Sequence, residues 1–177
     1  MQTLGEIVSL YRQIISETQQ ELNKVSHRIH HVGTIRLILF VAGVAGIIYF
    51  HNESSILIVA IAALTFIPFL ILIKRHNRLF YRKDYLEKKI EINEWELKAI
   101  DYDISAFDGG DEFINPAHLY SYDLDIFGNR SLFQYINRTS TQSGKIRLAD
   151  WFNIPLKRKE DIEKRQNAVR ELTPLLT

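Results

Sequence analysis

The sequence predicts an all-α membrane protein, in which a two-helix transmembrane hairpin is extended by an antiparallel coiled coil and followed by a smaller helical segment. Two apolar runs, residues 35–50 and 56–73, are separated by a turn of only five residues. Heptad repeats of apolar residues flank the two runs on both sides. Helical periodicity returns beyond a Gly-Gly break at residues 109–110.

The average composition conceals a division of the chain between two solvents. The mean hydropathy is −0.09 and 24% of residues are charged, yet residues 37–73 contain a single charged residue, Glu53. The rest of the chain is therefore unusually polar. A net charge of +1 gives no electrostatic reason to expect binding to nucleic acid. The chain has no cysteine, which excludes disulfides and thiolate metal sites and fits a reducing compartment.

Residues 32–74 are expected to form the transmembrane hairpin of a cell-membrane protein with two spans. Each apolar run lies near the lower end of the roughly 17–25 residues that cross about 30 Å of hydrocarbon. Basic residues precede the first run and follow the second, and the turn has none, so the positive-inside rule places both termini in the cytoplasm. The alternative is a buried hairpin in a soluble domain, but the chain has too few other apolar residues to cover two helices. Contacts with the anionic lipid surface are expected from Lys74, Arg75, Arg78, Arg82 and Lys83.

Residues 1–31 and 75–107 are each expected to form a heptad helix. The seam residues are Leu4, Val8, Tyr11, Ile15, Thr18, Leu22, Val25 and Ile29 before the hairpin, and Leu79, Lys83, Leu86, Ile90, Asn93, Leu97, Ile100, Ile104 and Phe107 after it. Because the hairpin reverses the chain, the two seams can pair antiparallel within one molecule. The same seams can instead pair two chains in a homodimer, and the sequence leaves both pairings open.

The carboxy-terminal part is expected to begin with a connector and to continue as three helices. Residues 108–130 carry Gly, Pro and aromatic residues without helical periodicity, which predicts an ordered, extended connector with a short strand as an option. Apolar spacing predicts helices from Ser131 to Asn137, from Thr141 to Phe152, and from Lys159 or Glu160 to Leu172. The residues expected on the buried side of the last helix are Ile162, Ala168, Val169 and Leu172.

The order and spacing of residues 131–172 resemble the opening of the MutS core domain. The residues that carry the resemblance are Ser131, Leu132, Asn137, Arg138, Thr139, Thr141, Gly144, Trp151, Pro155, Leu156, Arg165 and Gln166. The preceding Tyr-Asp-Leu-Asp-Ile-Phe-Gly segment, residues 122–128, resembles the lead-in of MutS-related proteins that carry an amino-terminal membrane hairpin. The resemblance covers about residues 118–177, so residues 131–177 are expected to be the start of a MutS-like helical core.

The resemblance implies an all-helical core that, in the family, joins DNA-embracing arms to an ATPase domain. For a full-length form it implies a membrane-anchored, ATP-dependent DNA-binding protein of the mismatch-repair type. It further implies that Thr139 or Thr141 caps a helix. Trp151 and Phe152 would pack in the core, and Pro155 would break the chain before the final helix. None of these roles is catalytic.

Two departures from the family pattern limit what this chain is expected to do alone. The segment Ser143-Gly144-Lys145-Ile146 lacks the leading glycine and the final hydroxyl of a phosphate-binding loop. No mismatch-reading domain is recognisable ahead of the core, so classical mismatch recognition is not expected. We expect no catalytic or cofactor site here; ATP, Mg²⁺ and DNA would bind only to a longer form, of which this chain would be the amino-terminal part. The competing hypothesis is a coiled-coil membrane scaffold without nucleotide chemistry.

Two clusters of ionisable residues do not predict a metal site. His27, His30 and His31 share a helix face near the membrane, but no further ligand completes a zinc site. The acidic residues of segment 108–125 fit connector and capping roles better than metal-assisted hydrolysis. No metal is therefore expected in this chain.

Overall fold

The computed structural model describes residues 4–50, 52 and 55–176, which form helices and turns without any strand. The all-α prediction is confirmed for this part of the chain. The chain divides into two compact units, Met1–Ile100 and Asp101–Thr177. Unit 1 contains two long helices, and unit 2 contains short helices joined by turns.

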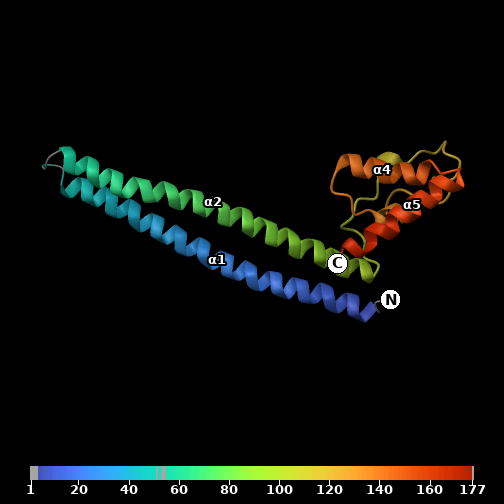
Figure 1. The fold of residues 1–177 in the computed structure, drawn as a ribbon, viewed down its shortest axis with the longest axis horizontal. Coiled ribbons are helices and arrows are strands. Elements are labelled where there is room, and N and C mark those ends of the chain that lie inside the picture. The colour runs from blue at the N-terminus through green and yellow to red at the C-terminus, as the bar shows by residue number, and fades with distance from the viewer. Residues whose placement is uncertain (1–3, 51, 53–54, 177) are drawn as a thin grey trace. The chain divides into compact units, whose positions relative to one another are not determined.

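Unit 1 consists of α1 (Leu4–Tyr49) and α2 (Ser55–Ile100), each of 46 residues. The two helices lie side by side and run in opposite directions (Figure 1). At a rise of 1.5 Å per residue each helix is about 70 Å long. Pro68 lies inside α2, and the helix continues through it. Of the predicted turn at residues 51–55, residues 51, 53 and 54 lie outside the described part of the chain.

The packed face of unit 1 follows the predicted heptad positions. Val25, Ile29 and Leu86 are buried together, and Leu22 and Leu79 pack against them. All five are residues of the two predicted seams. Burying this apolar stripe is what stabilises helices of this length in water, since helix propensity alone contributes little.

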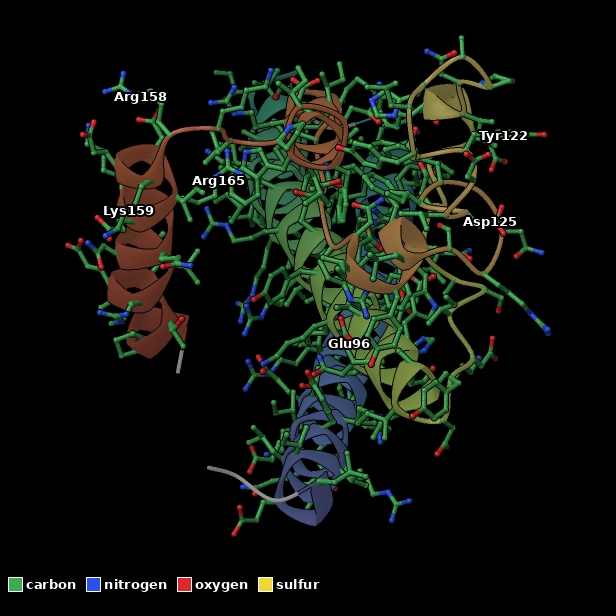
Figure 2. The ribbon with its side chains drawn as sticks, turned by 90° about the vertical axis from the view of Figure 1, so that its right-hand side faces the viewer. Glu96, Tyr122, Asp125, Arg158, Lys159 and Arg165 are labelled. Carbon is green, nitrogen blue, oxygen red and sulfur yellow. The ribbon has the colours of Figure 1, made fainter. Side chains whose placement is uncertain are left out.

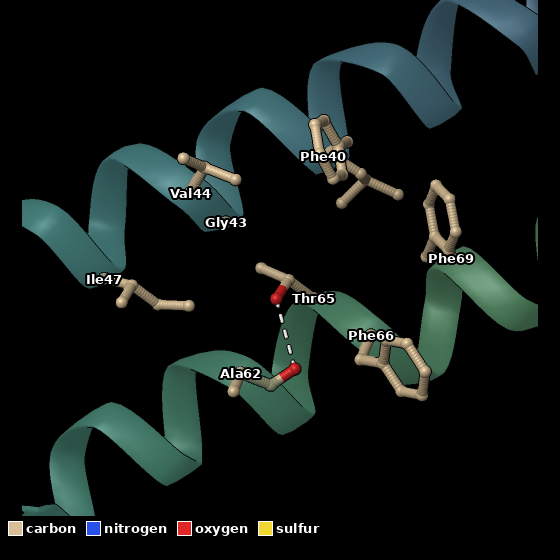
Figure 3. A pocket seen from close by; sticks show the side chains of 9 residues that line it. Phe40, Gly43, Val44, Ile47, Ala62, Thr65, Phe66 and Phe69 are labelled. Carbon is tan, nitrogen blue, oxygen red and sulfur yellow. Dashed lines mark hydrogen bonds between the residues drawn. The ribbon is translucent and has the colours of Figure 1, made fainter.

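Close contact between α1 and α2 continues into the apolar runs, where Gly43 faces Thr65 and Phe40 lies near Phe69. A Cβ atom on Gly43 would lie 3.0 Å from Thr65 Oγ1, so glycine allows the helices to approach here. The Thr65 hydroxyl donates to the carbonyl oxygen of Ile61 at 2.9 Å and to that of Ala62 at 3.1 Å. Figure 3 shows Gly43 opposite Thr65 in an apolar groove of about 260 Å³.

The apolar runs of both helices are largely open to the surroundings. Both helices are long and apolar enough to cross a membrane, and only 11% and 0% of their most apolar 18-residue windows are buried. The core helices of a soluble protein would be covered, because leaving such runs in water forfeits the burial that drives folding. In unit 1, no described residue covers the outer sides of these runs.

α2 ends at Ile100, so the expected helix to residue 107 is wrong in its last two turns. Tyr102 has a φ of 63°, a left-handed conformation that ends a helix. The Asp103 carboxylate accepts from the Ser105 backbone N–H at 3.2 Å and from its hydroxyl at 2.6 Å. Such local bonds compete with helix formation. Ile104 and Phe107 therefore belong to unit 2 and not to the helical seam.

Unit 2 contains the three predicted helices at nearly the predicted bounds. These are α3 (Leu132–Ile136), α4 (Gln142–Asn153) and α5 (Lys159–Leu172). A 3-10 helix, η1 (Asp111–Phe113), precedes them and another, η2 (Thr173–Leu176), follows. The expected connector is not extended and has no strand; it turns repeatedly. Positive φ angles at Gly110, Asp125, Gly128 and Arg130 reverse its direction.

The connector supplies much of the core of unit 2. Phe133 of α3 is fully buried, with Ile126, Phe127 and Ala149 around it. The Phe133 ring centroid lies 5.1 Å from that of Phe127 and 6.1 Å from that of Phe152. These tilted and edge-on arrangements are the preferred ones for aromatic pairs. The connector is therefore part of a folded unit rather than a spacer.

α5 is less covered than its sequence pattern predicts. The four residues expected on its buried side are all exposed within the described chain. α5 contacts α4 through Arg165, whose guanidinium carbon lies 4.3 Å from the centroid of the Trp151 ring. Figure 2 shows Arg165 on the side of α5 toward α4, with Arg158 and Lys159 at the helix start. Trp151 is exposed and stacks with Arg165, so its expected place in the core is wrong. Phe152 packs against the core as predicted.

Candidate functional site

Three residues of the family pattern, Ser131, Asn137 and Thr141, belong with Gln134 and Lys145 to a set of bonded side chains that is called the polar clamp here. Ser131 Oγ accepts from the backbone N–H of Gln134 at 3.1 Å and so caps α3. Thr141 Oγ1 accepts from the Gly144 N–H at 3.1 Å and caps α4. Each cap satisfies an amide that the first helical turn leaves without a partner. Of the two expected capping residues, Thr141 caps α4.

Asn137 ties the segment after α2 to the link between α3 and α4. Its side chain is 4% exposed, and Nδ2 donates to the carbonyl oxygen of Asp108 at 3.0 Å. Oδ1 accepts from the Thr139 N–H at 3.0 Å and from the Thr139 hydroxyl at 2.6 Å. A buried amide with its groups satisfied in this way fixes two backbone segments at once.

Gln134 makes a second bridge of the same kind. Nε2 donates to the carbonyl oxygen of Phe107 at 2.7 Å, and Oε1 accepts from the Arg130 N–H at 2.6 Å. The Arg138 guanidinium carbon lies 3.5 Å from the centroid of the Phe107 ring. Gln134 was not predicted as a functional residue. Its signal is the polar spacing at 131, 134 and 137, which runs from the N-cap of α3 to its C-cap.

Lys145 contributes ion pairs to the clamp. Its ammonium group forms ion pairs with Asp108 and, at 2.5 Å, with Glu112, and its side chain is only 13% exposed. The hydrogen bond from Lys145, aided by the Gly110 N–H, lowers the pKa of Asp108, and the Lys145 bond likewise lowers the pKa of Glu112. The bonds to Asp108 and Glu112 raise the pKa of Lys145. The Lys145 ammonium group is thus held by carboxylates of the protein itself.

Glycine is required where the connector crosses itself. The Gly128 N–H donates to the Gly109 carbonyl oxygen at 2.9 Å. A Cβ atom on Gly109 would collide with the carbonyl group of Gly128. The Gly-Gly break read from the sequence is therefore a close backbone approach that positions Asp108 and Glu112 for Lys145.

Other residues of the family pattern lie outside the clamp. Pro155 and Leu156 lie in the link between α4 and α5, and Gln166 is exposed on α5. Leu132 is half-exposed beside the buried Phe133. Gly144 lies in the first turn of α4, where it donates the capped amide.

The residues predicted to touch the membrane surface all lie on α2 of unit 1. Lys74, Arg75 and Arg78 are exposed. Arg82 donates to Glu21 of α1 at 2.7 Å, and Lys83 lies 3.4 Å from Glu87. Two of the five cations are therefore paired with carboxylates in the described structure.

The clamp fixes backbone segments through hydrogen bonds from its side chains. Ser131, Gln134, Asn137 and Thr141 bond to main-chain groups, and Lys145 pairs with the carboxylates of Asp108 and Glu112. Within the described residues, no three His, Asp or Glu side chains gather as a metal site. The arrangement organises the backbone of unit 2.

The fold and the clamp define a class of protein: two membrane-length helices followed by a small helical unit organised by side-chain bonds to backbone. Residues 120–176 match the family model MutS domain III. The chain is therefore MutS-related in its carboxy-terminal segment, and the resemblance is confined to that segment. It spans the clamp from Ser131 to Lys145 and the helices α3 to α5. Neither the comparison with curated proteins nor that with solved structures finds a match.

Replacing Asn137 with alanine is expected to destabilise unit 2 by about 2–3 kcal/mol. The change leaves the Asp108 carbonyl and the Thr139 amide without their partner, and a buried unsatisfied group costs about 1–3 kcal/mol. Denaturant unfolding followed by Trp151 fluorescence, in a Trp95→Phe background, measures this loss. The matched control is Asn129→Ala at an exposed position of the same unit. Equal losses in the two variants would contradict the assigned role of Asn137.

Replacing Lys145 with methionine is expected to flatten the acid dependence of unit 2 unfolding. Asp108 and Glu112 have lowered pKa values in the folded state, so their contribution is complete above their ordinary values near 4 and is lost as the pH falls through the lower folded values. Lys145 has a raised pKa, so its contribution is complete below its ordinary value and ends only in strong alkali. Unfolding midpoints between about pH 6 and pH 3 report the difference. Lys157→Met, at an exposed cation, serves as control, and an unchanged acid slope in Lys145→Met would contradict the ionic role.

Proposed function

We propose that this chain is the membrane anchor and core-domain start of a MutS-related protein that, in a longer form, binds DNA in an ATP-dependent manner at the membrane. One observation carries the proposal: the chain joins a MutS domain III segment to two membrane-length helices with open apolar runs. Neither feature alone indicates this function. Together they support the proposal of DNA-related machinery on a membrane tether.

The anchor in this proposal is a helical hairpin with two spans and with both termini in the cytoplasm. The support is the charge distribution, because eight Lys and Arg residues and one acidic residue, Glu53, lie between residues 22 and 83. The cations lie at the cytoplasmic ends of both apolar runs. Unit 2 follows α2 on the same side and would be presented to cytoplasmic nucleic acid.

The parts of α1 and α2 outside the apolar runs, called the arms here, act in this proposal as an intramolecular antiparallel coiled coil. The support is the shared seam and the Arg82–Glu21 pair between the helices at 2.7 Å. The coil would hold unit 2 away from the lipid surface. DNA and nucleotide would bind in further domains of the longer form, in keeping with the family's use of this core as a link.

The absence of cysteine makes the topology directly testable. Three variants each carry a single cysteine, at Asn52 in the turn, at Ser9 in α1 or at Ser140 in unit 2. Intact cells that make each variant are treated with a membrane-impermeant maleimide. Only Asn52→Cys is expected to react from outside, whereas Ser9→Cys and Ser140→Cys react only after the membrane is opened. Labelling of Ser140→Cys in intact cells would overturn the proposed orientation.

The nucleic-acid part of the proposal makes a separate prediction about this chain alone. It is expected neither to hydrolyse ATP nor to bind DNA tightly, because the ATPase and DNA-embracing parts would lie in the longer form. Filter binding with homoduplex and mismatched DNA compares this chain with the longer form. Nanomolar, mismatch-selective binding by this chain alone would contradict the proposed division of labour.

The second candidate is a coiled-coil membrane scaffold without nucleotide chemistry, which the 46-residue length of both helices favours. The contacts of Gly43 with Thr65 and of Phe40 with Phe69 set a register that, carried along the pair, brings Ile15 beside Asn93. A disulfide between Ile15→Cys and Asn93→Cys is expected within one chain at high dilution. Products found only between chains would support the scaffold dimer and exclude the intramolecular arms.

A further inference from the structure

We propose that Lys74, Arg75 and Arg78 form a binding site for the headgroup of an anionic glycerophospholipid. The site rests on the membrane anchoring proposed above and specifies what the anchor recognises. It lies on one face of α2, where the apolar run ends. The occupant is lipid, and each argument below depends on residues of this helix and its surroundings.

Charge is strongly segregated around this site. Between Glu21 and Asp84 the chain contains one acidic residue, Glu53, at the far end of the hairpin. The same stretch contains eight of the 22 Lys and Arg residues, so the rest of the chain carries an excess of acidic residues. A protein with a net charge of only +1 thus presents a local cationic surface beside its apolar runs. Such a surface attracts anionic lipid within a Debye length.

The three cations surround a shaped groove rather than standing singly. Lys74, Arg75 and Arg78 line a cavity of about 350 Å³ together with Ile71 and Leu79. Their spacing of three and four residues places Arg78 on the same helix face as the other two cations. Ile71 lies in the last turn of the apolar run, and Arg78 lies about 10 Å further along the axis. That interval spans the boundary between hydrocarbon and headgroups.

These cations are available to a ligand, in contrast to their neighbours. In the described part of the chain no carboxylate pairs with Lys74, Arg75 or Arg78, whereas Arg82 pairs with Glu21 and Lys83 with Glu87. All three available side chains are exposed. Arginine presents a planar fork that can bind two phosphate oxygens at once, and lysine adds a mobile point charge.

The aliphatic part of the groove distinguishes a lipid from a free anion. Ile71 and Leu79 offer a surface to the glycerol and first acyl carbons of a lipid, and a soluble phosphate gains nothing from them. The headgroup meets the cations while its chains continue into the bilayer beside the apolar run. An anionic glycerophospholipid satisfies both halves of the site.

The test uses the full chain in nanodiscs and measures the lipids that remain bound on gentle extraction, by native mass spectrometry. Discs contain phosphatidylcholine with a minor fraction of phosphatidylglycerol or phosphatidylserine. The variant Lys74→Gln/Arg75→Gln/Arg78→Gln removes the site. The matched control, Lys88→Gln/Lys89→Gln/Lys98→Gln, removes three positive charges from the same helix outside the site. Excess glycerol 3-phosphate serves as the soluble competitor.

The wild type and the control are expected to retain anionic lipid in preference to phosphatidylcholine. The site variant is expected to lose that preference by a factor on the order of one hundred, because each of the three cations contributes about 1 kcal/mol near the surface. Glycerol 3-phosphate should not displace the lipid. Equal retention by the site variant and the control, or displacement by the soluble phosphate, would overturn the lipid site. Cysteine labelling at Asn52 reports insertion independently, so failure of the anchor and failure of the site give different results.

Discussion

Replacing Phe133 with alanine is expected to cost unit 2 about 3–5 kcal/mol, which is the usual range for removing a buried aromatic side chain. Phe133 is 0% exposed and is the meeting point of α3, the connector and α4. Its loss would leave a cavity beside Phe127 and Phe152, whose rings it now contacts. Unit 2 is a small domain, and small domains have little stability to spare. We therefore expect much of unit 2 to be unfolded at room temperature in this variant.

The neighbouring Leu132 supplies the control for this prediction. Leu132 lies on the same helix but is half-exposed, so Leu132→Ala should cost much less. Trp151 fluorescence, in the Trp95→Phe background, and resistance to proteolysis report the folding of unit 2 in both variants. Helical circular dichroism from unit 1 should persist in Phe133→Ala, because the seam of α1 and α2 does not include Phe133. Equal stability of Phe133→Ala and Leu132→Ala would contradict the assigned core.

The parts of the fold that sequence analysis predicted well are those encoded by neighbours in the chain. Ser131 and Thr141 were placed at helix starts, and both cap helices through bonds to amides three residues on. The last helix was predicted to begin at Lys159 or Glu160, and α5 begins at Lys159. The MutS resemblance was expected over about residues 118–177, and the family match covers residues 120–176. Local spacing was sufficient in each case.

The parts that were missed depend on contacts between residues distant in sequence. Gln134 and Lys145 gain their roles from Phe107, Asp108 and Glu112, some 27 to 37 residues away. No local pattern encodes such partners. The connector was expected to be extended because its turns use left-handed residues that periodicity does not register. The end of α2 was misplaced for the same reason.

The seam between α1 and α2 shows a change of residue type that helical periodicity does not explain. In the arms it is built from large aliphatic residues such as Val25, Ile29 and Leu86. In the apolar runs Gly43 meets Thr65 in close contact. In water, burying large apolar side chains drives helices together. In lipid that drive is absent, and small residues that allow close backbone approach take its place. The close Gly43–Thr65 contact supports the proposal that the hairpin passes from water into lipid.

Charges placed on the outer faces of the apolar runs test whether lipid or water surrounds these runs. Val41 and Leu64 lie near the middle of the two runs and are 57% and 76% exposed. Replacing both with arginine leaves the packed seam intact. If lipid surrounds them, each arginine costs about 2.5–3.5 kcal/mol at the centre of a span, or about 5–7 kcal/mol together. The double variant should then leave the membrane fraction on alkaline extraction.

The matched control places the same two charges on the arms, at Leu10 and Ile92, which are exposed on α1 and α2 outside the runs. Leu10→Arg/Ile92→Arg should remain membrane-bound, because exposed substitutions in water usually change stability by less than about 0.5 kcal/mol. A soluble hairpin would instead tolerate both double variants alike, since either would only add charge to a surface already in water. Identical fractionation of the two variants would therefore contradict the proposed membrane anchor. It would also contradict the reason for proposing that a MutS-related segment lies at a membrane.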